Sequence, residues 1–356
     1  IRTPLNGIIG MSYLLRETPL TVEQIDYLES LRFSGEILLQ SVNDLMDLSR
    51  FEAGLLEVES EPFDLHQPVG EAIDVGAFSA FGKGLEFSCE IDPDVPETLV
   101  GPAPRIRQIL VNFISNAAKY TSKGFIHLRV HVESRVADQL NLRFSVTDSG
   151  YGLSHELKQR LFLPYSRGEK EVTNEVVGTG LGLSLCKRLV ALMHGDIGAS
   201  GEQGQGSTFW FSVPLGLVKP APVEPADPCL IGKRVLMAIS QVKLGEGLFD
   251  LLTREKAEID WVHTGQEALK RLQKAADHKH PYALAVFDTR LEDVERFDLV
   301  RSAKAFFPVK PSSVVMLHSP IDYQGMVGFE EEEVSCLKKP VKPWVFFRKV
   351  REIIRS

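Results

Sequence analysis

The run Gly-Thr-Gly-Leu-Gly-Leu at residues 178–183 is a candidate for binding a phosphate group. Glycines at this spacing also occur in ordinary turns. No strand pattern precedes the run and no Gly-Lys-Ser or Gly-Lys-Thr follows it, so it matches neither the dinucleotide-binding fingerprint nor the P-loop. Apolar residues follow at helical spacing: Leu181, Leu183, Leu185, Cys186, Leu189 and Val190. The run therefore predicts a loop that enters a helix, where unpaired backbone N–H groups and the helix dipole favour phosphate.

A second set of polar residues lies on a helical pattern at residues 105–121. Asn112, Asn116 and Lys119 recur at intervals of three and four and therefore share one side of the helix. Asn116 can offer a neutral oxygen to Mg²⁺, which binds triphosphates with few protein ligands. Lys119 can meet a phosphate as a point charge. The alternative is that these residues only form the solvated face of the helix.

A third set follows an alternating strand pattern at residues 140–147, which ends in Asp148-Ser-Gly-Tyr-Gly152. An acid followed by glycine at a strand end can simply mark a turn. Asp148 can also accept a hydrogen bond from the amine of adenine while Gly150 and Gly152 allow the ring to approach. Together with a further glycine group at residues 204–206, these residues predict a pocket for a nucleotide.

The order of these groups resembles that of the sensor histidine kinases. Five motifs follow the order and spacing of that family's N, G1, F, G2 and G3 boxes: Asn116 with Lys119, Asp148-x-Gly150-x-Gly152, Phe162-x-Pro164-Tyr165, Gly178-x-Gly180-x-Gly182 and Gly204-x-Gly206-Ser-Thr-Phe. The resemblance implies a Bergerat-type ATP site in an α/β sandwich. ATPases of the gyrase and heat-shock chaperone type share this kind of site, so the motifs alone do not establish kinase activity.

The same resemblance implies a role for each residue. Asn116 would bind Mg²⁺, Asn112 and Lys119 would lie near the phosphates, and Asp148 would bind adenine. Residues 169–179 would form a lid, and Tyr120 would pack beside the nucleotide. The implied ATP-binding residues are Asn112, Asn116, Lys119, Tyr120, Asp148, Gly150, Gly152, Phe162, Gly178, Thr179, Gly180, Leu181, Gly182, Leu183 and Thr208.

Two helical patterns, at residues 1–16 and 22–52, precede the site. An isolated hairpin cannot bury their apolar stripe, so the pattern predicts a homodimer with a four-helix bundle. The alternative is packing against a later part of the same chain. The opening Ile1-Arg-Thr-Pro-Leu-Asn resembles the phosphotransfer motif of the same kinases, one residue after its His-Glu pair. The acceptor histidine is therefore expected upstream of residue 1, and Thr3 matches the position that orients water in the phosphatase reaction.

After a proline-rich linker at residues 217–228, strand and helix patterns alternate. Alternation of this kind predicts a doubly wound, flavodoxin-like sheet. The segment resembles a response-regulator receiver, in which Asp288 and Lys339 match the acceptor and the lysine. Ile239 and Ser240 stand where the receiver's acid pair would bind Mg²⁺, and His318 stands where a hydroxyl residue is expected. We therefore predict a pseudoreceiver in which Asp288 and Lys339 form a structural ion pair.

The composition limits the classes of protein to which this chain can belong. A chain of 356 residues with net charge -8 and 44% hydrophobic residues suggests two or three domains of a cytoplasmic protein. No stretch approaches the roughly 20 apolar residues of a membrane span, and no basic arm indicates nucleic-acid binding. The cysteines show neither metal-ligand nor disulfide spacing and are expected as buried thiols. They are Cys89, Cys186, Cys229 and Cys336.

The combined expectation is a multi-domain α/β hybrid histidine kinase core. It comprises a dimerising hairpin (1–54), an ATP-binding domain (55–216), a linker (217–228) and a regulatory pseudoreceiver (229–356). Its histidine would receive phosphoryl from ATP and pass it to an aspartate of a receiver beyond Ser356 or on a separate response regulator. The pseudoreceiver could also bind a second messenger or a protein. The alternative functions are a catalytically silent ATP-binding scaffold and a chaperone-type ATPase, although the latter leaves residues 1–52 unexplained.

Overall fold

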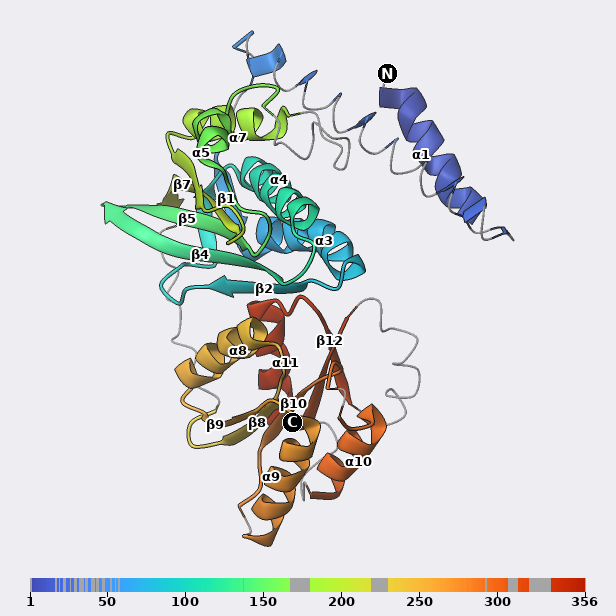
Figure 1. The fold of residues 1–356 in the computed structure, drawn as a ribbon. Coiled ribbons are helices and arrows are strands. Elements are labelled where there is room, and N and C mark those ends of the chain that lie inside the picture. Colours follow the sequence, from blue (N-terminus) through green and yellow to red (C-terminus); the bar gives the residue numbers. More distant parts are fainter. Residues whose placement is uncertain are drawn as a thin grey trace.

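The computed structural model describes residues 2–16, some positions between 18 and 56, and residues 58–136, 138–166, 180–218, 230–278, 280–291, 293–306, 313–319 and 334–355. These residues form an N-terminal helix, a central unit of residues 58–218 and a C-terminal unit of residues 230–355 (Figure 1). Both units combine helices with a sheet, so the predicted α/β class is confirmed.

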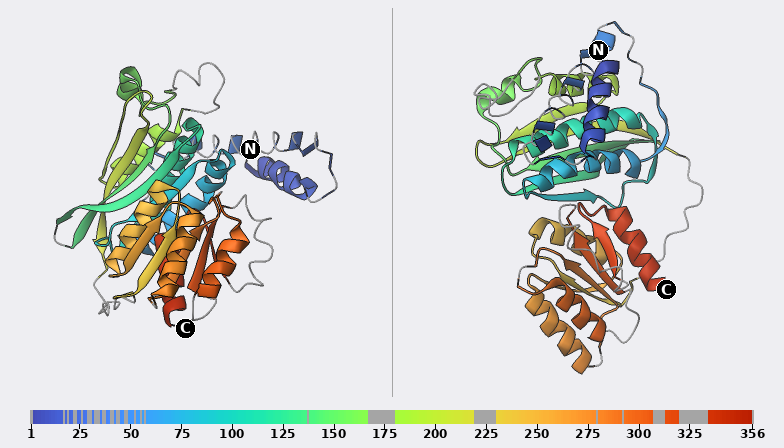
Figure 2. Two further views of the ribbon diagram at one scale, coloured as in Figure 1. Left: turned by 60° about the horizontal axis from the view of Figure 1, so that its bottom comes forward. Right: turned by 90° about the vertical axis from the view of Figure 1, so that its right-hand side faces the viewer.

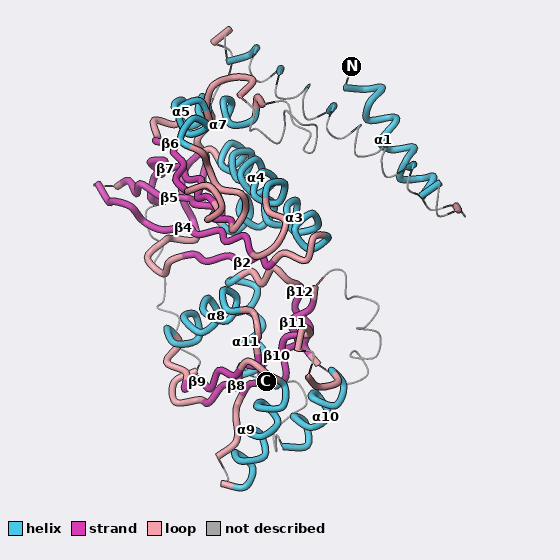
Figure 3. The backbone as a smooth tube through the Cα atoms, in the orientation of Figure 1, coloured by secondary structure: helices cyan, strands magenta, loops and turns pink. Residues whose placement is uncertain are grey.

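The central unit is a seven-stranded mixed sheet covered by helices on one face (Figure 3). The strand order is β1-β3-β7-β5-β4-β2, and β6 pairs with β7. The β2–β4 pair is parallel, while the other described pairs are antiparallel. The strands are β1 (Glu61–Asp64), β2 (Glu86–Ile91), β3 (Thr98–Gly101), β4 (Phe125–Val136), β5 (Gln139–Asp148), β6 (Asp196–Gly201) and β7 (Ser207–Leu217). The helices are α3 (His66–Gly82), α4 (Ala103–Tyr120), α5 (His155–Arg160) and α7 (Gly182–Leu192).

Helix α4 forms the centre of this unit. The apolar spacing of the sequence predicts a buried face of Ile106, Ile109, Leu110, Phe113, Ile114 and Ala117, and all six are buried, together with Ala118. Phe113 lies between the rings of Phe209 and Phe211 on β7, at centroid distances of 5.7 and 5.9 Å. Full burial of such a side chain stabilises the fold by about 2–3 kcal/mol. Packing of this face fixes the rotation of α4 and therefore the direction in which its polar side points.

Helix α3 holds α4 from the other side. At Gly76 an added Cβ would lie only 2.1 Å from Ile114 Cγ2, so glycine permits the close approach of the two helices. Lys83, at the C-terminal end of α3, donates to the carbonyl oxygens of Ala118 at 2.6 Å and Lys119 at 3.1 Å. A cation at these carbonyls also complements the helix dipole. Hence α3 fixes the end of α4 that carries Lys119.

The C-terminal unit is a five-stranded parallel sheet in the order β12-β11-β10-β8-β9. This is the doubly wound order predicted from the sequence. Helices α8 and α11 pack on one face and α9 and α10 on the other (Figure 2). The strands are β8 (Arg234–Ala238), β9 (Glu258–Val262), β10 (Leu284–Asp288), β11 (Val314–His318) and β12 (Ser335–Lys338). The helices are α8 (Val242–Arg254), α9 (Gly265–Asp277), α10 (Arg296–Phe306) and α11 (Pro343–Arg355).

Helix α10 has no counterpart among the elements predicted from the sequence. Its segment Arg-Phe-Asp-Leu-Val-Arg-Ser-Ala-Lys-Ala-Phe is weakly apolar and carries only a narrow hydrophobic face. Leu299, Val300 and Ala303 nevertheless reach the core under the sheet, where they meet side chains of α9 and β11. Tertiary packing rather than sequence periodicity therefore defines this helix.

Helix α1 (Arg2–Arg16) confirms the first helical pattern. It exposes the apolar side chains of Ile8 by 50%, Met11 by 65% and Leu14 by 64%. The second helical pattern lies mostly outside the described residues, so the four-helix bundle stays a prediction. Among the described helices, none has the length and apolar character needed to cross a bilayer.

The cysteines correct one expectation. Cys89 and Cys186 are buried thiols, as predicted, whereas Cys336 is exposed. Cys336 lies on the edge strand β12, where the alternation of side chains turns Leu337 inward and Cys336 outward. Cys229 lies outside the described residues.

We expect acid to destabilise the central unit through His127 on β4. Burial, with the positive charges of Lys243 and Arg129, lowers the pKa of His127 to about 4, and its Nδ1 lies 2.9 Å from Ser88 Oγ. The unfolded chain binds this proton near pH 6.5, so the free energy of unfolding falls as the pH drops from about 6.5 to about 4. Between pH 7.5 and 5.5 the loss is about 1.3 kcal/mol. Urea denaturation of His127→Gln should lack this part of the pH dependence, and an unchanged dependence would contradict the assignment.

Candidate functional site

The polar side of α4 carries the first part of the site. Asn116 Nδ2 donates to Asn112 Oδ1 at 3.0 Å, so the two amides hold one another one helical turn apart. Lys119 Nζ lies 2.9 Å from Tyr120 Oη and 4.7 Å from the centre of its ring. Asn112, Asn116 and Lys119 are all half-buried. The structure thus gives these residues one common, partly desolvated surface, which differs from the freely solvated helix face that the sequence left open.

The glycine run meets this surface. A Cβ added at Gly182 would lie 2.1 Å from Asn112 Nδ2, so the first residue of α7 lies directly against the Asn112 amide. Leu181, Leu185, Cys186, Leu189 and Val190 are buried as predicted, and Leu183 is half-buried. Their packing points the N-terminus of α7 toward the polar side of α4. The backbone N–H groups of a helix N-terminus, which favour anions, and the Asn112–Asn116 pair are therefore neighbours.

Asp148 ends β5 and is 4% exposed. Its Oδ1 accepts from the Gly150 backbone N–H at 2.8 Å and from Thr121 Oγ1 at 3.4 Å, while Oδ2 accepts from Ser207 Oγ. Three donors therefore fix the carboxylate, which still has acceptor capacity for one more hydrogen bond. Sequence reasoning did not select Thr121 or Ser207. Ser207 could have been found, because it follows the glycine group at residues 204–206 and faces Asp148 in the strand register.

The other glycines serve backbone packing around this carboxylate. An added Cβ would lie 2.5 Å from the Tyr120 carbonyl oxygen at Gly150, and 1.8 Å from the Glu202 carbonyl oxygen at Gly152. Gly152 also has a φ of +69°, which side chains other than glycine rarely adopt. These residues bring the turn after β5 against α4 and the turn before β7. These two glycines thus allow backbone segments around the site to pack closely against each other.

The remaining predicted residues lie around the same region. Thr208 Oγ1 is 3.0 Å from Thr147 Oγ1 on the neighbouring strand. Phe162 is half-buried and packs on the core of the central unit. The Gly180 carbonyl oxygen accepts from the Tyr165 N–H at 3.0 Å, which ties the F motif to the glycine run. Gly178, Thr179 and the predicted lid at residues 169–179 lie outside the described residues.

Two protein families match parts of the chain. The family described as histidine kinase-, DNA gyrase B- and HSP90-like ATPase matches residues 101–217, which contain the site. The His Kinase A (phospho-acceptor) domain matches residues 1–54 and separates the kinases from the other ATPases of that group. The chain belongs to the sensor histidine kinases. The family inferred from the order of the motifs is therefore confirmed.

Relatives of this histidine kinase include hybrid and sensor kinases. It is 39% identical over 235 residues to the sensor histidine kinase GacS of Pseudomonas protegens, covering 66% of this chain and 26% of GacS. Its identity to the histidine-protein kinase BarA of Escherichia coli is 35% over 260 residues, covering 73% of this chain and 28% of BarA. The chain thus spans about a quarter of the length of these relatives. A crystal structure of full-length ShkA in complex with AMPPNP matches with a TM-score of 0.70 and 28% identity, covering 100% of this chain and 70% of that one.

A second buried carboxylate lies in the C-terminal unit of the kinase. The Asp288 side chain is 0% exposed and the Lys339 side chain 3% exposed, and the two form an ion pair. Lys339 Nζ also donates to Gln241 Oε1 at 2.9 Å, and Asp288 Oδ1 accepts from the Arg290 N–H at 3.0 Å. The ion pair between Asp288 and Lys339 is therefore present, as predicted.

The positions that would hold a receiver's acid pair carry no acid in this chain. Ile239 is buried, Ser240 is exposed, and buried His318 Nδ1 lies 3.2 Å from the Ser319 carbonyl oxygen. Among the described residues no group of three His, Cys, Asp or Glu side chains is arranged to hold a metal ion. Gln241, which the sequence analysis did not select, supplies a neutral oxygen to Lys339 instead.

Gly182→Ala should weaken nucleotide binding by about tenfold, equivalent to about 1.4 kcal/mol. The added methyl group displaces Asn112 from the N-terminus of α7, although alanine is the better helix former. Titration with a fluorescent ATP analogue measures the effect. Gly82→Ala is the matched control, because nothing lies within 4 Å of its added Cβ, and it should bind like the parent. Equal affinities for the two variants would show that the Gly182–Asn112 contact is not part of the site.

Lys339→Met should destabilise the C-terminal unit by about 3–5 kcal/mol, because it leaves the buried Asp288 carboxylate without a counter-charge. The double variant Asp288→Leu with Lys339→Met removes both charges and should recover much of that loss. Urea denaturation followed by circular dichroism compares the two variants. If the double variant proved as unstable as the single one, the ion pair would not be the source of the effect.

Proposed function

We propose that this chain is the ATP-dependent autokinase core of a hybrid two-component kinase. The observation that supports it most is the contact between the start of α7 and the Asn112–Asn116 pair on α4, which joins the glycine motif to the asparagine motif. The match to the phospho-acceptor domain at residues 1–54 supports a histidine as the group that receives phosphoryl. The complex of ShkA with AMPPNP supports an adenine nucleotide as the ligand.

Adenine binds at Asp148 in this proposal. The Gly150 N–H and the Thr121 and Ser207 hydroxyl groups hold the carboxylate so that its remaining acceptor position meets the exocyclic amine of adenine. A carboxylate fixed by three donors needs no rearrangement when the base arrives, which lowers the cost of binding. Tyr120, at the end of α4, packs beside the nucleotide.

The phosphates extend from Asp148 toward α7. Backbone N–H groups at the start of α7 and the Lys119 ammonium group offset their charge. Asn116 fits a Mg²⁺ ligand, because its half-buried amide is oriented by Asn112 and provides a hard oxygen donor. When bound, Mg²⁺ would neutralise charge on the β- and γ-phosphates. The residues 169–179 would close over the nucleotide and exclude water.

Transfer then requires the histidine of the hairpin. A neutral imidazole nitrogen attacks the γ-phosphorus, a P–N bond forms, the bond to the bridging oxygen breaks, and ADP leaves with the electron pair. The histidine belongs to the phospho-acceptor motif that begins before Ile1. Thr3 lies exposed on α1, one turn beyond that position, and would orient water if the kinase also acts as a phosphatase. The exposed stripe of α1 would pair with a second copy of the chain.

The final acceptor in this proposal is an aspartate of another receiver, beyond Ser356 or on a separate response regulator. The C-terminal unit has the strand order of a receiver, but Asp288 is paired with Lys339, and Ile239 and Ser240 occupy the positions of the acid pair. We assign it as a pseudoreceiver with a regulatory role. The proposed domains are therefore the hairpin at 1–54, the ATP-binding domain at 55–216, the linker at 217–228 and the pseudoreceiver at 229–356.

Labelling with γ-labelled ATP and Mg²⁺ tests the proposal on the chain extended upstream of Ile1. We expect a label that survives base but not acid, as a phosphohistidine does, and that disappears in Asn116→Ala. Ser115→Ala is the matched control, because Ser115 is exposed on the same helix and should keep the label. A chain that binds ATP without becoming labelled would instead be a silent scaffold. A label unaffected by Asn116→Ala would contradict the assigned site.

A further inference from the structure

The C-terminal unit packs against the central unit on the side away from the start of α7. Helices α8 and α11 lie beside strand β2, as Figure 1 and the right-hand view of Figure 2 both show. The segment that follows β12 also reaches helix α3 of the central unit, through Lys342 and Trp344. Helix α3 is also the helix that holds α4. The contact therefore reaches an element next to the nucleotide site.

Trp344 of α11, in the C-terminal unit, packs on the hydrophobic core of the central unit. Its ring stacks on His66 of α3, with centroids 4.5 Å apart and planes 18° apart. It is half-buried and packs on the hydrophobic core of the central unit, whereas Phe346 and Val350 of the same helix pack in the core of the C-terminal unit. A tryptophan of one unit that packs on the hydrophobic core of the other is typical of an interface anchor.

Helix α3 is shaped to receive this side chain. A Cβ added at Gly70 would lie 3.2 Å from Trp344 Cζ2 and 3.4 Å from Lys342 Nζ. Glycine inside a helix costs about 1 kcal/mol relative to alanine. At Gly70 that cost is offset by space for the indole ring, so the two units fit one another at this position.

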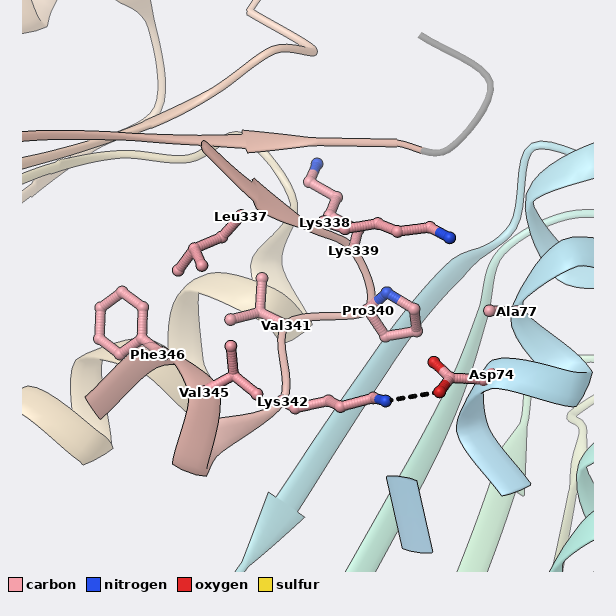
Figure 4. A pocket seen from close by; sticks show the side chains of 10 residues that line it. All are labelled: Asp74, Ala77, Leu337, Lys338, Lys339, Pro340, Val341, Lys342, Val345 and Phe346. Carbon is pink, nitrogen blue, oxygen red and sulfur yellow. Dashed lines mark hydrogen bonds and ion pairs between the residues drawn. The ribbon is translucent and has the colours of Figure 1, made fainter. Parts of the chain in front are cut away.

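An ion pair fixes the orientation of the same contact. Lys342 Nζ lies 2.8 Å from Asp74 Oδ2, and Figure 4 shows the two side chains pointing toward each other across a cavity of about 220 Å³. Because Asp74 is 67% exposed, the pair adds little affinity. Arg254 of α8 lies 3.8 Å from Glu90 of β2 and extends the charge pairing along the interface. Trp344 therefore supplies the affinity and the ion pairs supply the register.

We propose that His66, Gly70 and Asp74 on α3 form a docking surface for Lys342 and Trp344 of the C-terminal unit, and that docking restrains the autokinase. Lys339 and Pro340 line the same cavity as Asp74, so the docked central unit also covers the end of the C-terminal sheet that holds the Asp288–Lys339 pair. The effect on the autokinase rests on the proposed function, whereas the docking itself does not.

The restraint follows from where the surface lies. Docking joins the C-terminal unit to α3, and Lys83 at the far end of α3 holds the carbonyl groups of Ala118 and Lys119 on α4. The central unit must move toward the hairpin to transfer phosphoryl, and a docked second unit opposes such a movement. Nucleotide affinity should change little, because no docking residue lies among the site residues.

Carbodiimide cross-linking tests the docking without relying on kinase activity. It joins Lys342 to Asp74 when they are paired, and peptide mass spectrometry detects the product. The Lys349–Glu352 pair within α11, at 3.3 Å, is an internal control that docking does not affect. Trp344→Ala and Gly70→Leu change opposite sides of the interface, and each should lower the Lys342–Asp74 product at least tenfold relative to the control product. Gly82→Ala should leave it unchanged.

The outcomes separate the two parts of the inference. Absence of the Lys342–Asp74 product in the parent chain, or its persistence in both variants, would overturn the docking surface. Circular dichroism and unchanged binding of the ATP analogue verify that each variant is folded. In the chain extended upstream of Ile1, both variants should autophosphorylate several-fold faster, and the double variant should be no faster than either one. Equal rates despite the lost cross-link would refute the restraint, while absence of label in every version would refute the proposed kinase function alone.

Discussion

The nucleotide site depends on a buried negative charge, the Asp148 carboxylate. A charge in this position is tolerated because the Gly150 N–H, Thr121 and Ser207 donate to it. These donors come from the turn after β5, the end of α4 and the start of β7. One carboxylate therefore joins three separate elements, and it does so at the end of α4 that carries Lys119.

The two units use buried aspartates differently, although both residues end a strand. Neutral donors hold Asp148, so no counter-charge within these contacts cancels its charge. Lys339 neutralises Asp288, and Gln241 accepts from the same ammonium group. The first arrangement suits recognition of a base, whereas in the second the protein supplies its own counter-charge to Asp288 Oδ1 and leaves Oδ2 buried without a hydrogen-bond partner. A phosphorylatable carboxylate needs neighbouring acids that bind a divalent ion, and apolar Ile239 cannot replace them.

Glycine determines how close the elements of this protein approach at three places. The absence of a side chain at Gly182, Gly76 and Gly70 leaves room for the side chains of Asn112, Ile114 and Trp344, respectively. The first contact builds the site, the second couples α3 to α4, and the third joins the C-terminal unit to α3. A series of close contacts between glycines and side chains thus links the unit interface, α3, α4 and α7. The proposed restraint would act along this series.

The sequence by itself determined the family, the fold classes and the faces of the helices, because the apolar periodicity of α4 and α7 and the order of the glycine motifs are local properties. It also predicted the Asp288–Lys339 pair from the missing acids. The burial of Cys336 was predicted wrongly, since an edge strand has no outer neighbour to cover it. The tertiary structure alone showed Ser207 and Thr121 beside Asp148, Gln241 beside Lys339, and Trp344 on α3. These contacts join residues far apart in the chain, and such pairings depend on how whole elements pack rather than on any local pattern.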